Sequence, residues 1–172
     1  MTLLPRIVTG LAATLFVGAA CATPPPPEVG DTFPDLRLTD QHEQPHRVDR
    51  ALRYVVFARD MAGNRIVREA FEGVTADLLV DRQVAIVADI HRMPGIVTRL
   101  FALPALRKRT YPIWLDRDGE PTAGLPYQEE HITLFELEAR LILSERFIAD
   151  SAALRAALFG DMAPALESGG GE

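Results

Sequence analysis

Two residue types that carry much protein chemistry are scarce in this chain of 172 residues, which contains one cysteine, Cys21, and four histidines, His42, His46, His91 and His131. A single thiol cannot form an internal disulfide. A metal site needs several histidines or carboxylates that converge, whereas two of these histidines lie on a polar turn and two lie beside predicted strands. We therefore expect no internal disulfide, no metal site and no cofactor.

Other short patterns do not predict catalysis. Asp116 and Asp118 are spaced like the first ligands of a calcium loop, but Pro121 occupies the position that needs glycine, so the pattern predicts a turn. Glu129 and Glu130 are adjacent on an extended segment, where side chains point in opposite directions. The chain has no Ser-His-Asp order, phosphate loop or dinucleotide fingerprint. We predict no catalytic residues.

One polar stretch stands between a predicted strand and a predicted helix. It holds Arg59, Asp60, Asn64 and Arg65, and His131 precedes a later strand. Backbone N–H groups at a helix start favour an anion, so Arg59, Asp60, Arg65 and His131 are candidates for a ligand or partner site. The alternative, which the sequence favours, is a capped helix start whose side chains are solvated.

Charge excludes one class of partner. The formal net charge is −6 and the isoelectric point is about 5.2. Nucleic-acid binding needs a positive face, so we expect no nucleic-acid partner. The run Arg107-Lys108-Arg109 can contact anionic headgroups, but cations near the end of a helix are expected in any case.

The N-terminus has the pattern of an export signal. Residues 7–20 are apolar or small and uncharged, too short to span a bilayer comfortably, and they end at Gly18-Ala19-Ala20-Cys21. This end resembles the lipobox of bacterial lipoproteins, in which the cysteine is acylated, although Gly18 replaces the usual aliphatic residue. Ordinary signal cleavage after Ala20 or Ala22 is the alternative. Prolines 24–27 predict a stiff polyproline spacer. We predict a signal peptide at 1–20 and a Pro-rich tether at 21–28.

Hydrophobic periodicity predicts one α/β domain at 29–160, followed by a flexible tail at 161–172. Asn64 is the expected N-cap of a helix whose apolar positions run from 66 to 79, and Ser151 the expected cap of the last helix. A middle helix at 94–106 contains Pro104, which should end or kink it. The order predicts a mixed central sheet with helices on both faces and an N-terminal β-hairpin. The predicted strands are 36–38, 46–48, 54–58, 83–90, 113–116, 132–137 and 141–148.

Three segments together resemble a known superfamily. The opening at 29–40 (VGDTFPDLRLTD), the strand at 54–57 (YVVF) and the segment at 112–119 (PIWLDRDG) are similar to peroxiredoxin-type and TlpA/ResA-type thioredoxin-like proteins. The cysteine-free YtfJ-type periplasmic proteins are similar by pattern as well. The resemblance spans about 29–159 and implies a thioredoxin-like fold.

The resemblance also implies a lost redox centre. Active members carry their cysteines where the strand at 54–58 meets the next helix, and Met61 and Asn64 occupy the corresponding degenerate positions. Active members also place a cis-proline before the final hairpin, where this chain has Glu130 and His131. A thioether and an amide cannot exchange a disulfide. We expect no thiol redox activity.

These inferences predict an exported, non-catalytic thioredoxin-like protein at the periplasmic face of a bacterial membrane, tethered by lipid on Cys21. Its expected partner is an envelope protein or peptide. Two alternatives stay open, an enzyme of unrecognised type that uses the polar stretch at 59–65, and a small-ligand carrier.

Overall fold

The protein is described here by a computed structural model that covers residues 25–160. The predicted signal peptide, Cys21 and the tail at 161–172 lie outside the described residues, so the predictions about them stay predictions. Within 25–160, no helix is long and apolar enough to cross a membrane.

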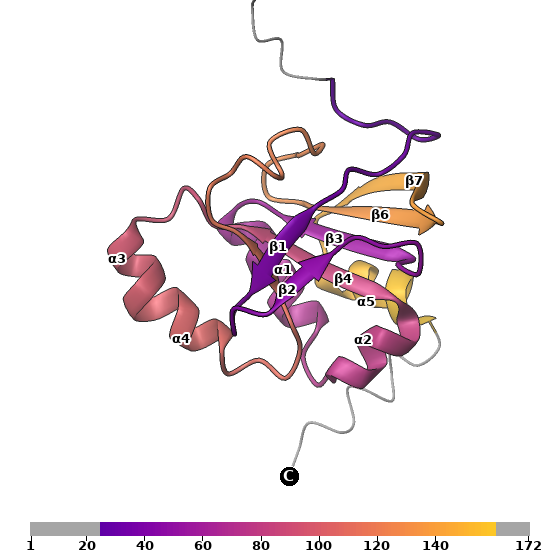
Figure 1. The fold of residues 1–172 in the computed structure, drawn as a ribbon. Helices are drawn as coiled ribbons and strands as arrows, with labels where there is room; N and C mark the ends of the chain where they lie inside the picture. Colours follow the sequence, from indigo (N-terminus) through magenta and orange to yellow (C-terminus); the bar gives the residue numbers. More distant parts are fainter. Residues whose placement is uncertain (1–24, 161–172) are drawn as a thin grey trace, which may run out of the picture.

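A seven-stranded mixed sheet forms the centre of the fold (Figure 1). The strand order is β2-β1-β5-β4-β3-β6-β7, in which β3, β4 and β5 are parallel neighbours and all other pairs are antiparallel. The α/β class, the mixed sheet and the N-terminal hairpin are thus confirmed. The strands are β1 (Arg37–Asp40), β2 (Pro45–Arg47), β3 (Tyr54–Ala58), β4 (Val84–Asp89), β5 (Trp114–Asp116), β6 (Ile132–Glu138) and β7 (Leu141–Ile148).

The helix expected over 66–79 is in fact two helices, and it starts earlier than predicted. α1 (Met61–Ala70) begins at the Asp60 cap rather than at Asn64, because the Asp60 carboxylate accepts the N–H of Gly63. α2 (Ala76–Arg82) is capped separately by the hydroxyl of Thr75. The chain turns between the two helices, where Gly73 has a φ of 74° that glycine adopts without steric cost.

The later helices also differ in detail from the prediction. α3 (Gly95–Val97), the π-helical η1 (Thr98–Ala102) and α4 (Leu103–Leu106) form one continuous segment that Pro104 does not end. A wider π turn directly precedes Pro104, which lacks the N–H that an α-helix requires. In α5 (Ser151–Phe159) the cap is Asp150, and Ser151 is the first helical residue.

The two faces of the sheet are covered differently. Val56 and Ala58 of β3 pack with apolar residues of the helices, whereas Val55 and Phe57 point the other way, as alternate residues of a strand do. The opposite cluster contains no helical residue of the described chain, so the expectation of helices on both faces is wrong. Both crossovers, β3 to β4 and β4 to β5, step in the same direction, and right-handed connections then place their helices on one face. The opposite face is covered by segments without helix, including Phe33, Leu36 and Leu125.

Candidate functional site

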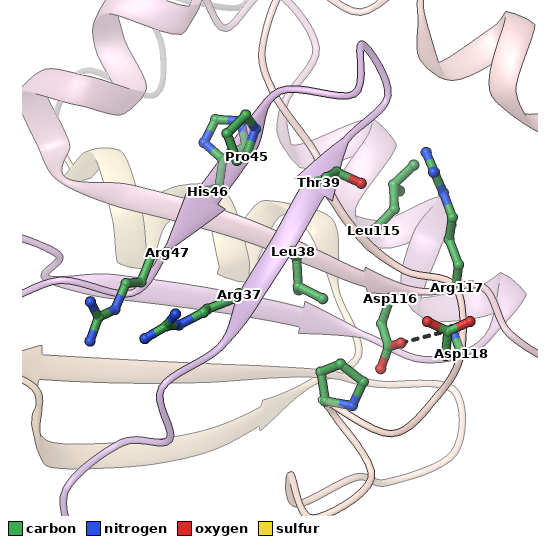
Figure 2. Close-up of a pocket in the computed structure, with 11 residues that line it drawn as sticks. Arg37, Leu38, Thr39, Pro45, His46, Arg47, Leu115, Asp116, Arg117 and Asp118 are labelled. Atoms are coloured by element: carbon green, nitrogen blue, oxygen red, sulfur yellow. Dashed lines mark hydrogen bonds between the residues drawn. The ribbon is translucent and has the colours of Figure 1, made fainter.

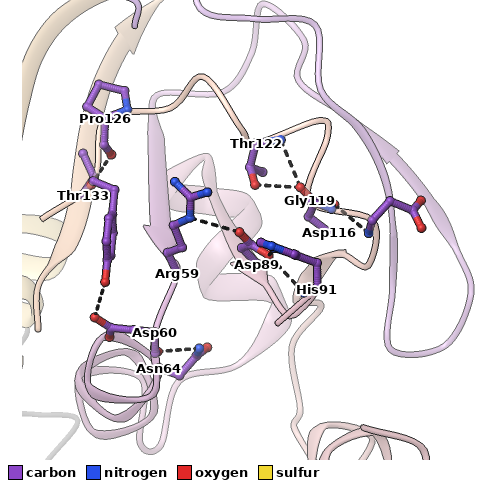
Figure 3. A network of polar contacts seen from close by, with 12 residues as sticks. Arg59, Asp60, Asn64, Asp89, His91, Asp116, Gly119, Thr122, Pro126 and Thr133 are labelled. Carbon is purple, nitrogen blue, oxygen red and sulfur yellow. Dashed lines mark hydrogen bonds and ion pairs between the residues drawn. The ribbon is translucent and has the colours of Figure 1, made fainter. Parts of the chain in front are cut away.

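Asp60 is the centre of the place where β3 meets α1. One carboxylate oxygen, Oδ1, accepts the N–H of Gly63 at 2.6 Å, and the other, Oδ2, accepts the Tyr127 hydroxyl and the Glu130 N–H, each at 2.8 Å. Figure 3 shows Asp60 in this place, with Asn64 beside it. Burial alone would raise the pKa of this carboxyl, but the hydrogen bonds from Gly63, Glu130 and Tyr127 outweigh burial and lower it. Asp60 therefore joins the start of α1 to the loop that leads into β6.

That loop packs closely on α1. A Cβ at Gly63 would lie 2.9 Å from the backbone oxygen of His131, so glycine is needed for the approach. The Asn64 side chain donates to the Asp60 carbonyl at 2.8 Å, and the Thr133 hydroxyl donates to the Pro126 carbonyl at 2.8 Å. We call Asp60, Gly63 and Asn64 together with residues 126–131 the closed junction.

Some of the site residues predicted from the sequence lie in this junction, and others are exposed to solvent. Met61, the first residue of α1, is 82% exposed, and Arg65 is exposed as well. His131 is half-buried in the junction, with Nδ1 2.7 Å from the carbonyl oxygen of Glu129. At the position where the resemblance implied a cis-proline, Glu130 has a φ of 61°, and residues 25–160 contain no cis peptide bond. The structure thus brings Asp60 and His131 into one junction but leaves Arg65 outside it.

Arg59 points to a different group, Asp89, which was not among the predicted site residues. Its Nε lies 3.3 Å from Oδ2 of the buried Asp89, and its guanidinium lies over the Tyr127 ring at 5.4 Å. Oδ1 of Asp89 lies 2.6 Å from Nδ1 of His91 (Figure 3). A carboxylate at Nδ1 fixes the orientation of an imidazole, as in catalytic and metal-bound histidines. The available signal was an aspartate and a histidine two residues apart at the carboxyl end of a buried parallel strand.

His91 lines a cavity of about 520 Å³, which we call the His91 cavity. Its ring packs on Gly119, where a Cβ would lie only 2.6 Å from the imidazole. Among the described residues, no hydrogen-bond partner is present at its other nitrogen, Nε2. The remaining lining residues are Glu43, Ile90, Met93, Gly95, Thr98, Leu103 and Arg117.

The predicted turn after β5 is confirmed. Oδ1 of Asp116 accepts the N–H groups of Asp118 and Gly119, and Oδ2 accepts the N–H and hydroxyl of Thr122. Both oxygens of the Asp116 carboxylate thus accept hydrogen bonds within the turn. No group of three or more potential metal ligands is present in the described part of the chain.

A second cavity, of about 510 Å³, lies over the hairpin of β1 and β2 (Figure 2). Its arginines are paired, because Arg37 and Arg47 contact Asp35 at 3.2 and 2.6 Å, and Arg117 contacts Glu43 at 2.8 Å. Neither this cavity nor the His91 cavity is lined by Asp60, Asn64, Arg65 or His131. These four polar residues therefore lie outside both cavities.

Comparison with known proteins shows the fold. No family model matches the chain, and no curated protein matches its sequence. Among solved structures, a putative thiol:disulfide interchange protein DsbE from Chlorobium tepidum is similar at 15% identity and a TM-score of 0.53, covering 81% of this chain and 98% of that one. The pneumococcal exposed lipoprotein thioredoxin from Streptococcus pneumoniae is similar at 11% identity and 0.53, covering 72% and 97%.

A putative protein disulfide isomerase from Bacteroides thetaiotaomicron has 14% identity and a TM-score of 0.51, with 76% and 86% of the two chains covered. This chain has the thioredoxin-like fold. At such identities the likeness extends to the fold alone, and the chemistry must be argued from this chain's own residues.

Proposed function

We propose that this protein is a non-catalytic, membrane-tethered thioredoxin-like module that binds an envelope protein or peptide. The observation that carries the proposal is the use of Asp60. All three of its hydrogen bonds hold the junction together, and none is directed to a vacant site. At the place where redox-active relatives keep reactive thiols, this chain has a structural carboxylate.

An exposed apolar side chain stands directly beside that carboxylate. Met61 is the most exposed of the large apolar side chains described, at 82%, and it lies at the start of α1. A flexible thioether suits contact with a partner surface, because it adapts its shape without needing a hydrogen bond. We therefore place the binding surface at Met61, with the exposed Arg65 on the same helix.

Partner capture with a matched control tests this proposal. The chain is used as bait in envelope extract, alongside Met61→Asp and Val80→Asp, the latter at a 74% exposed position on α2. We expect one partner at a fixed stoichiometry that is lost with Met61→Asp and retained with Val80→Asp. Loss with both variants or with neither would contradict a surface at Met61.

The tether is proposed from the lipobox-like sequence, and one neighbour in the structural comparison is itself described as an exposed lipoprotein. Fractionation of cells that express Cys21→Ser tests the tether directly. Acylation predicts that the variant leaves the membrane fraction. Unchanged fractionation would overturn the lipid anchor without bearing on the binding surface.

A second candidate function, a small-ligand carrier, is favoured by the His91 cavity. An imidazole fixed by Asp89 faces apolar side chains, among them Met93 and Leu103, and such a mixed lining is typical of ligand sites. Native mass spectrometry of freshly purified protein should then show a bound small molecule that His91→Ala releases. A chain of unmodified mass in both samples would exclude this function.

A further inference from the structure

The segment at 95–106, made of α3, η1 and α4, stands at the side of the sheet (Figure 1). On its inner side, Leu103 and Leu106 are only partly buried against the core. On its outer side, Ile96 is 74% exposed and Leu100 is 63% exposed, although both are large and apolar. Residues four apart lie on one side of a helix, so these two form a small apolar face toward solvent.

The same part of the chain is strongly basic. Residues 90–115 contain five arginines and lysines and no aspartate or glutamate, within a chain whose net charge is −6. A basic segment of this length in an acidic protein marks a surface that attracts an anionic partner.

Three of these cations are exposed and form no ion pair with a described carboxylate. None of the exposed Arg92, Arg107 and Lys108 forms an ion pair with a described carboxylate, whereas Arg37, Arg47 and Arg117 elsewhere all do. Arg107 donates to the Gln41 carbonyl at 3.0 Å, so Arg92 and Lys108 are the exposed cations that remain available to an anionic partner within the described chain.

We propose that residues 92–109 form a docking surface for an anionic lipid bilayer. Ile96 and Leu100 would enter the boundary between headgroups and acyl chains, and the flanking cations would contact lipid phosphates. Long basic side chains reach headgroups while apolar neighbours sit deeper, so the two kinds of exposed residue act together. A bilayer also requires no shaped cavity, which agrees with two exposed side chains on one side of a helical segment.

This inference adds a membrane contact that does not depend on Cys21. It rests on residues of the folded domain, and the lipid anchor rests on the sequence at the N-terminus. The docking surface is therefore tested in a Cys21→Ser background, which has no lipid anchor. A failure of the docking surface then says nothing about the anchor, and a failure of the anchor says nothing about the docking surface.

The decisive measurement compares two fluorescent labels on the full chain. In the Cys21→Ser background, a single cysteine at Leu100→Cys carries an environment-sensitive fluorophore, and Val80→Cys on α2 provides the control. Vesicles of phosphatidylcholine, with or without phosphatidylglycerol, are then added. Any binding through the apolar residues 7–20 is common to both variants, so the difference between labels tests the surface.

We expect a blue shift at position 100 that requires phosphatidylglycerol, and none at position 80. Equal responses at the two positions, or no response at position 100, would overturn the proposal. A response to both vesicle types would overturn the role assigned to charge. A label at position 100 that responds to poly-glutamate but not to vesicles would instead assign the surface to an acidic protein.

Charge substitutions provide an independent measurement. Replacing Arg92 and Lys108 by glutamine should weaken the anionic-vesicle titration of the position-100 label roughly 20-fold at low salt. The matched control replaces Arg50 and Arg146, which are exposed and form no ion pair with a described carboxylate, and leaves the net charge equal. An equal loss in both double variants would show that net charge alone acts and would overturn the surface.

Discussion

The carboxyl ends of β3 and β4 are neighbours in the parallel part of the sheet, yet the chain leaves them in contrasting ways. After β3 it enters the closed junction, where Asp60 holds a helix start and a distant loop together. After β4 it passes the His91 cavity and continues into a segment with exposed apolar residues and the exposed cations Arg92 and Lys108. The Asp60 carboxylate at the end of β3 is thus fully hydrogen-bonded within the domain, whereas the end of β4 leads to a cavity and to exposed side chains.

The difference between the two strand ends shows that position in a fold does not decide where chemistry lies. The end of β3 is the position where the sequence resemblance implied a redox centre, and here both oxygens of the Asp60 carboxylate accept hydrogen bonds from the domain itself. The end of β4 carries a histidine oriented by a buried carboxylate and facing a cavity. Substitutions should therefore lower the free energy of unfolding strongly at the closed junction. They should lower it only slightly in the segment at 95–106, which we call the open segment.

The largest effect is expected for Asp60→Ala. The variant loses the helix cap and leaves the Tyr127 hydroxyl and the Glu130 N–H without their acceptor, which should lower the free energy of unfolding by about 3 kcal/mol. Urea denaturation measures the change. Asp60→Asn retains a capping oxygen and should cost about half as much. A loss below about 0.5 kcal/mol for alanine would show that the junction does not depend on this carboxylate.

A somewhat smaller effect is expected for Gly63→Ala. Helix propensity alone favours alanine by about 1 kcal/mol, but the added Cβ would lie 2.9 Å from the His131 oxygen, so we expect a net loss of about 2 kcal/mol. Gly95→Ala in α3 is the control, because nothing lies within 4 Å of its Cβ position. Thermal unfolding that ranks the two variants in the opposite order would contradict the closed packing of the loop.

The pH dependence of stability gives a third comparison. The pKa of Asp60 is lowered in the folded protein, so its contribution is complete above the unfolded value near 3.8 and disappears as the pH falls through the folded value. The difference in melting temperature between the wild type and Asp60→Asn should therefore be constant from about pH 5 to 7 and shrink below about pH 4. A difference that persists unchanged to pH 2.5 would show that ionisation of Asp60 is irrelevant.

The smallest effect is expected in the open segment. Replacing both Ile96 and Leu100 by serine should change the free energy of unfolding by less than about 0.5 kcal/mol, because these side chains bury little area on folding. Urea denaturation of the double variant measures this. A large loss would mean that the outer face packs against the domain and is not available to a membrane.

Much of the fold was predictable because the central strands β3 and β4 are nearly continuous apolar runs. β3 and β7 have the predicted limits, and the other strands lie within two residues of them. The covered strands β3 and β4 leave a clear apolar signal, whereas β7 has one buried residue, Ile142, and was recognised by its place in the final hairpin. The break between α1 and α2 was missed because apolar spacing continues through Val74. The local signals for it, Gly73 and the capping Thr75, were present in the sequence.

The sequence by itself determined that this domain has no thiol at the strand–helix junction, since Cys21 is the only cysteine and precedes the domain. It also determined the acidic charge and the basic stretch within it. Only the tertiary structure decided that Asp60, and not Asn64, caps α1, and that its carboxylate binds residues 67 and 70 positions away. Local patterns specify strands and helices, whereas contacts between distant segments depend on how the sheet brings strand ends and loops together. For the same reason His91 appeared to be one of several dispersed histidines until the structure showed its ring held by Asp89, whose other oxygen contacts Arg59.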